Sequence, residues 1–195
     1  MAGHGARHGV TGILLAAGRG SRFDPSGARN KLLQPLGDST VVAISARNLM
    51  AALPRVVAVV RPGDDATAAA LRGLGCEIVV SERAADGMAA SLVTGIHHAQ
   101  EALGWVIALG DMPHVRPATI SALAREVEEG AGIAVPMHEG QRGNPVAFGR
   151  EHLPLLLALE GDQGARGIVR NNPNNVVTVD DAGILQDIDT PSDLK

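Results

Sequence analysis

An α/β fold, with a mostly parallel sheet covered by helices on both faces, is predicted from three features of the chain. Short runs rich in Val, Ile and Leu alternate with longer segments of helical periodicity. The runs are continuously apolar, which is typical of parallel strands buried on both faces. A length of 195 residues without repeats, low-complexity tracts or linkers fits a single domain.

Strands and helices are expected to alternate up to Gly140. The first apolar run ends at a glycine-rich turn, and the second is the valine-rich stretch after Arg55. Pro117 suits the first turn of a helix, because the N–H that proline lacks needs no partner there. Right-handed crossovers should connect the strands. Strands are predicted at residues 12–16, 55–60, 76–80, 105–109 and 133–136, and helices at 40–52, 65–72, 88–103 and 117–129.

Beyond Gly140 the alternation loosens. Further strands are predicted at 145–148 and 176–179, with helices at 152–159 and 164–171 between them. The glycine-rich residues 1–10 are predicted to form a flexible N-terminal tail, and residues 11–195 to form the folded domain.

Composition excludes some classes of protein. Phe23, Trp105 and Phe148 are the only aromatic residues, so the core must be built from Ala, Val, Leu and Ile. The net charge of −4 and the scarcity of aromatic side chains argue against a nucleic-acid binder, which needs a basic face or a stacking platform. Small anionic ligands remain compatible with this charge, because a few basic residues can dominate one site.

Cys76 and the lengths of the apolar runs predict the localisation. A single cysteine cannot form an intramolecular disulfide, which fits a reducing compartment, and a small buried role is expected for it. The longest apolar runs, such as 56–60, are far shorter than the ~20 residues of a membrane helix. Residues 13–17 are too few for the apolar segment of a signal peptide. The protein is therefore expected in the cytoplasm, without membrane association.

A phosphate-binding turn is predicted directly after the first strand. Gly18 and Gly20 let the backbone approach a ligand closely and aim N–H groups at it, while Arg22 and Lys31 supply positive charge. The turn lacks the Gly-Lys-Ser/Thr of a P-loop, and Phe23 stands where the dinucleotide-binding pattern has its third glycine. A different kind of polyphosphate site is therefore expected.

Acidic residues are expected at the same edge of the sheet. Ligands of open parallel sheets bind at the carboxyl ends of the strands, and Asp111 follows the predicted strand 105–109. A carboxylate that faces a polyphosphate there is a natural Mg²⁺ ligand, and a turn or cap aspartate before Pro113 is the alternative. Asp187 and Asp189 alternate on a predicted short final strand, so only one of them should reach the metal.

A series of short motifs extends this pattern over nearly the whole chain, from Thr11 to Leu194. The motifs are residues 15–23 (LAAGRGSRF) with 31–33 (KLL), 87–92 (GMAASL), 110–113 (GDMP), 142–146 (RGNPV), 161–166 (GDQGAR) and 187–194 (DIDTPSDL). In this order they resemble the molybdenum cofactor cytidylyltransferases, within the molybdopterin nucleotidyltransferase-like (NTP transferase) family. The loop between Arg22 and Lys31 departs from the pattern, because it is longer than in many members.

The resemblance implies a Rossmann-like nucleotidyltransferase fold and an Mg²⁺-dependent reaction. That reaction is transfer of CMP from CTP to the phosphate of molybdopterin, which gives molybdopterin cytosine dinucleotide and pyrophosphate. The implied partners are CTP or GTP, molybdopterin and a recipient molybdoenzyme. By resemblance, the catalytic residues are Arg22, Lys31 and Asp111, and the metal ligands are Asp111 and Asp189.

The resemblance also assigns binding residues to the two substrates. For Ser91, the alternative to a binding role is that of a capping or packing serine. For Asp162, the alternative is that of a helix cap. The implied nucleotide-binding residues are Leu15, Ala16, Ala17, Gly18, Gly20, Ser21, Arg22, Lys31, Ser91 and Asp111, and the implied second-substrate residues are Arg142, Asn144, Asp162 and Arg166.

The implied reaction needs neither a protein nucleophile nor a general base. A phosphate monoester is already mostly dianionic at neutral pH, because its second pKa is about 6. No role is expected for the histidines. His97 and His98 are consecutive on a predicted helix and face different directions, His4 and His8 lie in the predicted tail, and His114 lies in a loop.

Other functions remain open on the sequence alone. A guanylyltransferase or another nucleotidyltransferase would use the same fold, although guanylyl relatives tend to have glycine where this chain has Ala17. An NAD-dependent oxidoreductase is disfavoured by Phe23 and by Arg61, which stands where an acidic residue should end the second strand. A non-catalytic carrier of the molybdenum cofactor would not need the set Arg22, Lys31, Asp111 and Asp189.

Overall fold

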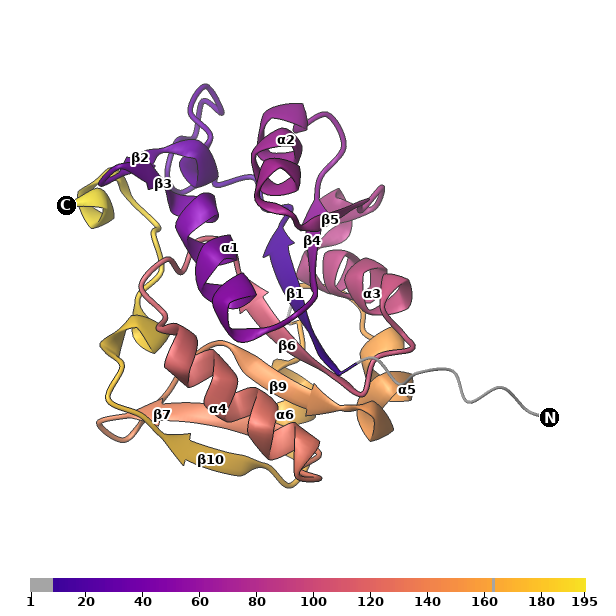
Figure 1. Cartoon of the computed structure of the whole chain (residues 1–195). Coiled ribbons are helices and arrows are strands. Elements are labelled where there is room, and N and C mark those ends of the chain that lie inside the picture. The colour runs from indigo at the N-terminus through magenta and orange to yellow at the C-terminus, as the bar shows by residue number, and fades with distance from the viewer. Residues whose placement is uncertain (1–8, 163) are drawn as a thin grey trace.

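The computed structural model describes residues 9–162 and 164–195 and has the expected α/β architecture (Figure 1). Within these residues the central sheet has eight strands, in the order β10-β7-β9-β6-β1-β4-β5, and β8 pairs with β7. The tail predicted over residues 1–10 falls mainly on residues 1–8, which lie outside the described part of the chain. Val10 already belongs to the first strand.

Every strand and helix predicted between residues 12 and 179 has a counterpart in the structure. The strands are β1 (Val10–Ala16), β4 (Val56–Val60), β5 (Glu77–Val80), β6 (Gly104–Leu109), β7 (Ile133–His138), β8 (Gln141–Arg142), β9 (Val146–Gly149) and β10 (Asn175–Thr178), with a separate hairpin of β2 (Pro35–Leu36) and β3 (Ser39–Thr40). The α-helices are α1 (Val41–Ala52), α2 (Asp65–Leu74), α3 (Met88–His98), α4 (Pro117–Glu128), α5 (Leu153–Leu157) and α6 (Arg166–Asn171).

The sheet is mostly parallel, as predicted. β1 runs parallel to β4 and β6, β4 to β5, and β10 to β7. Two strands are antiparallel to their neighbours: the short β8 pairs antiparallel with β7, and β9 with both β6 and β7. The first residue of β9, Val146, pairs with Ile107. The chain just before β9 therefore lies near the carboxyl end of β6.

Helices cover both faces of the sheet and build two cores. On one face, side chains of α1, α2 and α4 pack against Leu14 and Val106. On the other face, α3, α5 and α6 pack against Ile13 and Ile107. Neighbouring residues of one strand thus enter different cores, because successive side chains of a strand point to opposite faces. Figure 1 shows α1 and α4 together in front of the sheet. Among the described residues, the helices are too short or too polar to span a lipid bilayer.

Several predicted element ends are wrong. The helix predicted at 88–103 ends at His98, because the chain turns back at Ala99, whose carbonyl accepts bonds from the Ala102 N–H at 3.1 Å and the Trp105 indole at 2.9 Å. The helix predicted at 152–159 is divided into a 3₁₀ turn, Arg150–His152, and the short α5. The helix predicted at 164–171 begins only at Arg166.

The final strand predicted around Asp187 and Asp189 is also wrong. Residues 186–189 form an irregular extended segment between two 3₁₀ turns, Ala182–Leu185 and Pro191–Leu194. A single backbone bond, from the Ile188 N–H to the Asp111 carbonyl at 2.8 Å, attaches this segment to the end of β6. Without a second strand to pair with, the segment is not held to strict alternation of its side chains.

Candidate active site

A pocket of about 390 Å³, here called the first pocket, lies where β1 and β6 end. The turn after β1 forms one wall, and Gly20 has a φ of +63°, a conformation that L side chains rarely adopt. The start of α3 and the 3₁₀ turn Ala84–Asp86 form the facing wall. All the predicted nucleotide-binding residues line this pocket, namely Leu15, Ala16, Ala17, Gly18, Gly20, Ser21, Arg22, Lys31, Ser91 and Asp111.

Two cations and two carboxylates meet at one end of the first pocket. Lys31 Nζ lies 2.8 Å from Asp111 Oδ2 and 3.5 Å from Asp189 Oδ1. Arg22 Nη1 lies 2.6 Å from Asp189 Oδ2. The side chain of Lys31 is 12% exposed and that of Arg22 is 78% exposed. Lys31 is therefore the inner cation of the site and Arg22 the outer one.

A third carboxylate, Asp187, joins this centre. One carboxylate oxygen from each of Asp111, Asp187 and Asp189 lies within 4.8 Å of those of the other two. The side chains of Asp187 and Asp189 therefore do not point to opposite faces, because the irregular backbone turns both carboxylates toward Asp111. Partial burial, and then the charge of Asp189, raises the pKa of Asp187 above its ordinary value. Three carboxylate oxygens are the hard donors that Mg²⁺ or Mn²⁺ prefers.

Backbone contacts hold Asp111 and Asp189 in place. The Gly110 N–H donates to the Leu15 carbonyl at 2.9 Å, and the buried Ser45 hydroxyl donates to the Gly110 carbonyl at 2.9 Å. At the other carboxylate, the N–H of Asp189 donates to Asp193 Oδ2 at 3.0 Å. Asp193 also completes a capping box with Thr190, which begins the last 3₁₀ turn. The turn after β6 and the C-terminal segment are thus fixed relative to each other.

The long loop before Lys31 is stabilised by its own contacts. Asp24 accepts hydrogen bonds from the Ser26 N–H and hydroxyl and from the Arg29 N–H. These bonds lower the pKa of Asp24, and the bond from the Ser26 hydroxyl has the largest effect. The guanidinium of Arg29 lies 5.4 Å from the centre of the Phe23 ring. The additional length of the loop does not displace Lys31 from the pocket.

Asp64 connects both sides of this loop, a role that was not predicted. It is the N-cap of α2, its side chain is 7% exposed, and it accepts a hydrogen bond from the Thr67 N–H at 3.3 Å. Its carboxylate also accepts from Asn30 Nδ2 at 3.1 Å and lies 3.6 Å from Arg61 Nη2. An Asp before a predicted helix signals a cap, and the cross-loop contacts carry no sequence signal.

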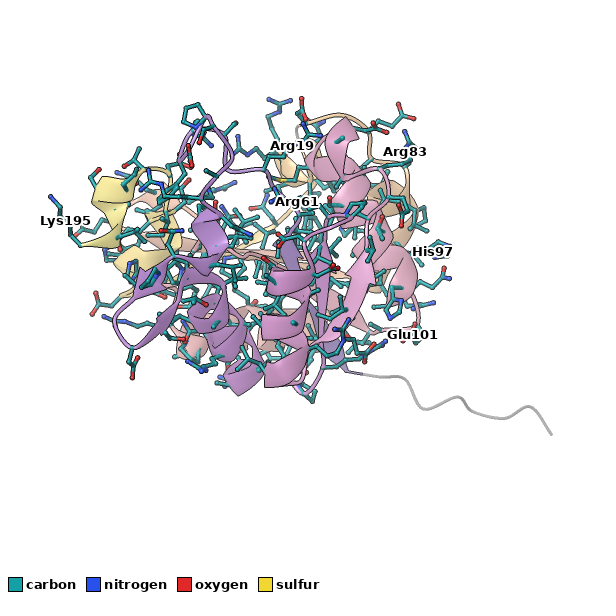
Figure 2. All side chains as sticks on the ribbon, turned by 90° about the horizontal axis from the view of Figure 1, so that it is seen from above. Arg19, Arg61, Arg83, His97, Glu101 and Lys195 are labelled. Carbon is teal, nitrogen blue, oxygen red and sulfur yellow. The ribbon has the colours of Figure 1, made fainter. Side chains whose placement is uncertain are left out.

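The two partners of Asp64 reach opposite ends of the segment from Gly18 to Lys31. Arg61 Nη1 donates to the Gly18 carbonyl at 3.1 Å, and Arg61 and Arg19 project on the same side of the molecule in Figure 2. Asn30 Oδ1 accepts from the Leu32 N–H at 3.1 Å and so caps the 3₁₀ turn Lys31–Leu33. Asp64, Arg61 and Asn30, here called the loop clamp, therefore fix Gly18 and Lys31 relative to each other.

A second pocket of about 480 Å³ adjoins the first and shares Leu15, Met88 and Leu109 with it. Of the predicted second-substrate residues, Arg142, Asn144 and Arg166 line it.

Asp162, the remaining predicted second-substrate residue, is not among the described residues that line the second pocket. Asp162 is exposed and lies against Gly87. A side chain at position 87 would collide with Asp162 and with the Gly161 carbonyl. Nor does Asp162 cap α6, whose N-cap is Ala165 without a side-chain bond. Its observed role is to pack the loop before α6 against the start of α3.

Ser91 is a buried hydroxyl on the wall of the first pocket. It is 5% exposed, and no hydrogen-bond partner is found for it among the described residues. Its position on the pocket wall makes its hydroxyl a free donor and acceptor for a ligand. Ser91 is not the cap of α3, whose N-cap is Gly87, while its burial agrees with packing as well as with ligand binding.

The histidines and the cysteine lie away from both pockets in the described part of the chain. His97, His98 and His114 are exposed, and His98 Nε2 lies 3.3 Å from Glu77 Oε2. Cys76 is buried with its sulfur 3.7 Å from that of Met50, and burial raises the pKa of its thiol to about 11. His4 and His8 lie outside the described residues. The groups that line the pockets are thus suited to binding anions and a metal ion, and they include no activated nucleophile.

Comparisons with known proteins agree with this geometry. Residues 12–176 match the family model described as the MobA-like NTP transferase domain. The molybdenum cofactor guanylyltransferase of Cupriavidus pinatubonensis is 29% identical, over 97% of this chain and 96% of that protein. The nicotine blue oxidoreductase of Paenarthrobacter nicotinovorans is also 29% identical, over 93% of this chain and 92% of that protein. The crystal structure of Rv0371c from Mycobacterium tuberculosis in complex with manganese is 30% identical, with a TM-score of 0.78 over 95% of both chains.

Proposed function

The chain belongs to the MobA-like NTP transferase domain family, and we propose that this nucleotidyltransferase transfers CMP from CTP to the phosphate of molybdopterin. The observation that carries the proposal is the pairing of two adjoining pockets with one charged centre. Lys31 and Asp111 line the first pocket. Leu109, two residues before Asp111 on the chain, lines both pockets. A nucleotide in the first pocket and an acceptor in the second would therefore meet beside Lys31.

The turn after β1 would bind the triphosphate. Its backbone N–H groups around Gly18 and Gly20 are suited to phosphate oxygens, since no side chain stands in front of them. Lys31, as the inner cation, would contact the α-phosphate, and Arg22, as the outer cation, the leaving phosphates. Both cations would offset the negative charge that increases on these oxygens in the transition state.

The carboxylates of Asp111, Asp187 and Asp189 would hold a divalent metal ion. Their oxygens are close enough to share one ion, and the related Rv0371c structure contains manganese. We propose Mg²⁺, because it binds by a few carboxylates together with substrate phosphates. Bound there, Mg²⁺ would polarise the α-phosphate and stabilise the pyrophosphate. In the structure Lys31 and Arg22 pair with two of these carboxylates, Asp111 and Asp189, so phosphates that draw these cations away would expose the metal ligands.

The proposed reaction is a direct displacement. A phosphate oxygen of the acceptor forms a bond to the α-phosphorus of CTP, the bond from that phosphorus to the β-phosphate bridging oxygen breaks, and pyrophosphate leaves. The acceptor phosphate is dianionic for the most part at neutral pH, so no residue has to remove a proton. This chemistry is compatible with pockets lined, in the described part of the chain, without histidine or cysteine.

The preference for cytosine is supported by the small space beside Ala17. Ala17 is 6% exposed and lines the first pocket, and its methyl group narrows the space for a base. A pyrimidine needs less room than a purine. Ser91, with its free hydroxyl, would bond the nucleoside from the other wall.

A competition experiment tests the proposal. The protein would be incubated with molybdopterin, Mg²⁺ and equal concentrations of CTP and GTP, and the dinucleotide products identified by mass spectrometry. We expect the cytosine dinucleotide to dominate. Dominance of the guanine product would identify a guanylyltransferase, the reaction named for the relative from Cupriavidus pinatubonensis. Absence of any dinucleotide would refute transfer to molybdopterin.

A further inference from the structure

The second pocket combines a basic rim with an acid-free lining. Arg142, Arg166 and Arg170 line it, and none of the described residues around it is acidic. No hydrogen bond or ion pair to another described residue is found for any of the three guanidinium groups. The whole chain has a net charge of −4, so this accumulation of positive charge is local to the pocket. Unpaired cations around one cavity indicate an anionic ligand.

The floor of the second pocket is apolar. Leu15 and Leu109 are direct neighbours across β1 and β6, and Ile107 and Val146 are neighbours across β6 and β9. Ile107 and Leu109 are two residues apart on β6, so their side chains share one face of the sheet. The strands thus supply a continuous apolar surface on one face of the sheet, on which the face of a ring system can pack.

The basic residues approach this floor from two elements. Arg166 and Arg170 are four residues apart on α6, a spacing that places both on one face of a helix. Ile168 of the same helix is buried in the core beneath, so the helix is fixed against the sheet. Arg142 belongs to β8, which pairs with β7. Two guanidinium groups on one helix face can bind one anionic group together. Arg142 lines the same pocket together with Asn144, two residues further along the chain.

From this arrangement we propose that the second pocket selects an acceptor with a planar ring system, one face of which packs on the apolar floor, and with a second anionic group, which Arg166 and Arg170 bind together. This second group is distinct from the phosphate that reacts beside Lys31. The inference rests on the proposed function, which it extends by defining the class of acceptor. It also assigns Arg170 a binding role that the sequence motifs do not include. Acceptors whose bodies are polar and uncharged, such as simple sugars, would bind poorly.

A pair of fluorescent probes tests this proposal without any nucleotide. 8-Anilinonaphthalene-1-sulfonate is flat, apolar and anionic, and N-phenyl-1-naphthylamine has the same ring system without the charge. We expect the wild-type protein to bind the anionic probe more tightly. Arg166→Ala and Arg170→Ala should each weaken binding of the anionic probe by about tenfold, as expected for the loss of one charge-assisted hydrogen bond, and leave the neutral probe unaffected.

Two further variants locate the effect. Arg125→Ala removes an exposed arginine from α4, which packs on the opposite face of the sheet, and should change neither affinity. Val169→Trp adds bulk inside the second pocket and should abolish binding of both probes, with circular dichroism as the check of folding. The nucleotide affinity of Arg166→Ala and Arg170→Ala should equal that of the wild type.

The outcomes separate this inference from the proposed function. Equal affinity of the wild type for the charged and neutral probes would overturn the inference, as would unchanged affinity in both arginine variants. A protein that makes the guanine dinucleotide would refute the cytidylyl proposal, and the differential loss of the anionic probe would still support the acceptor class.

Discussion

Asp111 is the residue on which the proposed chemistry depends most directly. It is paired with Lys31, close to Asp187 and Asp189, and placed by the backbone at the end of β6. We predict that Asp111→Asn lowers the rate of nucleotidyl transfer by about 100-fold or more, because one preorganised electrostatic contact is commonly worth that much. The melting temperature should change little, since the side chain lies at a strand end outside the cores.

Steady-state kinetics and a thermal melt measure both effects for Asp111→Asn. Asp180→Asn changes an exposed aspartate whose side chain has no hydrogen bond or ion pair to the described residues, so it is the matched control and should behave as the wild type. Near-normal turnover by a folded Asp111→Asn protein would rule out the assignment of Asp111 to the metal.

Lys31 contributes charge at a fixed position. We predict that Lys31→Ala weakens CTP binding or slows transfer, because the inner cation of the pocket is lost, and that Lys31→Arg recovers only part of the activity, since a guanidinium does not occupy the place of an ammonium group. Calorimetric titration with CTP and single-turnover rates separate the two effects. Lys195→Ala provides a control, as Lys195 lies far from Arg19 in Figure 2. If Lys31→Ala left both quantities unchanged, Arg19 or Arg29 would have to supply the charge.

Ala17 should influence the choice of base. We predict that Ala17→Gly increases the relative use of GTP, because it removes a methyl group from the first pocket. The effect should not reverse the preference, since a single contact is worth only a few kcal/mol and other groups must recognise the edge of the base. The ratio of kcat/KM for CTP and GTP measures it. An unchanged ratio would show that the base does not lie beside Ala17.

Among the elements, the loop clamp of Asp64, Arg61 and Asn30 connects helix α2 to the site. Asp64→Ala removes the N-cap of α2 and should lower the free energy of unfolding by about 1 kcal/mol. The KM for CTP should also rise, because Gly18 and Lys31 lose their common support. Asp64→Asn keeps a good cap, so it should restore stability while the KM stays raised, since the charge that pairs with Arg61 is gone.

Urea unfolding and steady-state kinetics test the role of the clamp. Asp65→Ala, at the neighbouring exposed position of the same helix, is the control and should leave the KM unchanged. A purely structural role for Asp64 would give Asp64→Asn both normal stability and a normal KM, which would contradict the positioning role.

The existence of the main strands and helices could be predicted from the sequence, whereas several of their ends, the β2–β3 hairpin and β8 could not. Central strands such as β1 and β4 are recognised because both of their faces are buried, which leaves a continuous apolar run. The end of α3 depends on a hydrogen bond from Trp105, a residue of the next strand, to Ala99. Such a contact between distant parts of the fold leaves no periodicity in the local sequence.

The same distinction holds for the candidate site. The sequence predicts that residues after β1 and β6 lie together, because the carboxyl ends of parallel strands share one edge, and the first pocket brings these residues together. The predicted alternation of Asp187 and Asp189 is not found, because it requires a paired strand and residues 186–189 do not form one. Asp162 was assigned to the acceptor by its motif, yet the loop before α6 turns it toward Gly87. The motif indicates the type of residue at position 162, and it does not determine which way the side chain points.

At the scale of the whole molecule, the antiparallel strand β9 determines how the two pockets meet. By reversing direction it brings Asn144 beside the end of β6 and adds Val146 to the floor of the second pocket. The overall charge of the chain is negative, while six basic side chains line the two pockets: Arg19, Arg22, Lys31, Arg142, Arg166 and Arg170. An acidic protein would thereby provide adjoining sites for the two anionic substrates that we propose.

Pyrophosphate release from each of the four nucleoside triphosphates, measured with Mg²⁺ and with or without molybdopterin, tests the central claim most directly. The account predicts rapid release with CTP, slower release with GTP, and release only when molybdopterin is present, since its phosphate is the attacking group. Addition of EDTA should stop the reaction, because the carboxylates of Asp111, Asp187 and Asp189 act through a metal ion. Release at the same rate without molybdopterin, or equal or faster release from GTP, would contradict the assignment of a molybdopterin cytidylyltransferase.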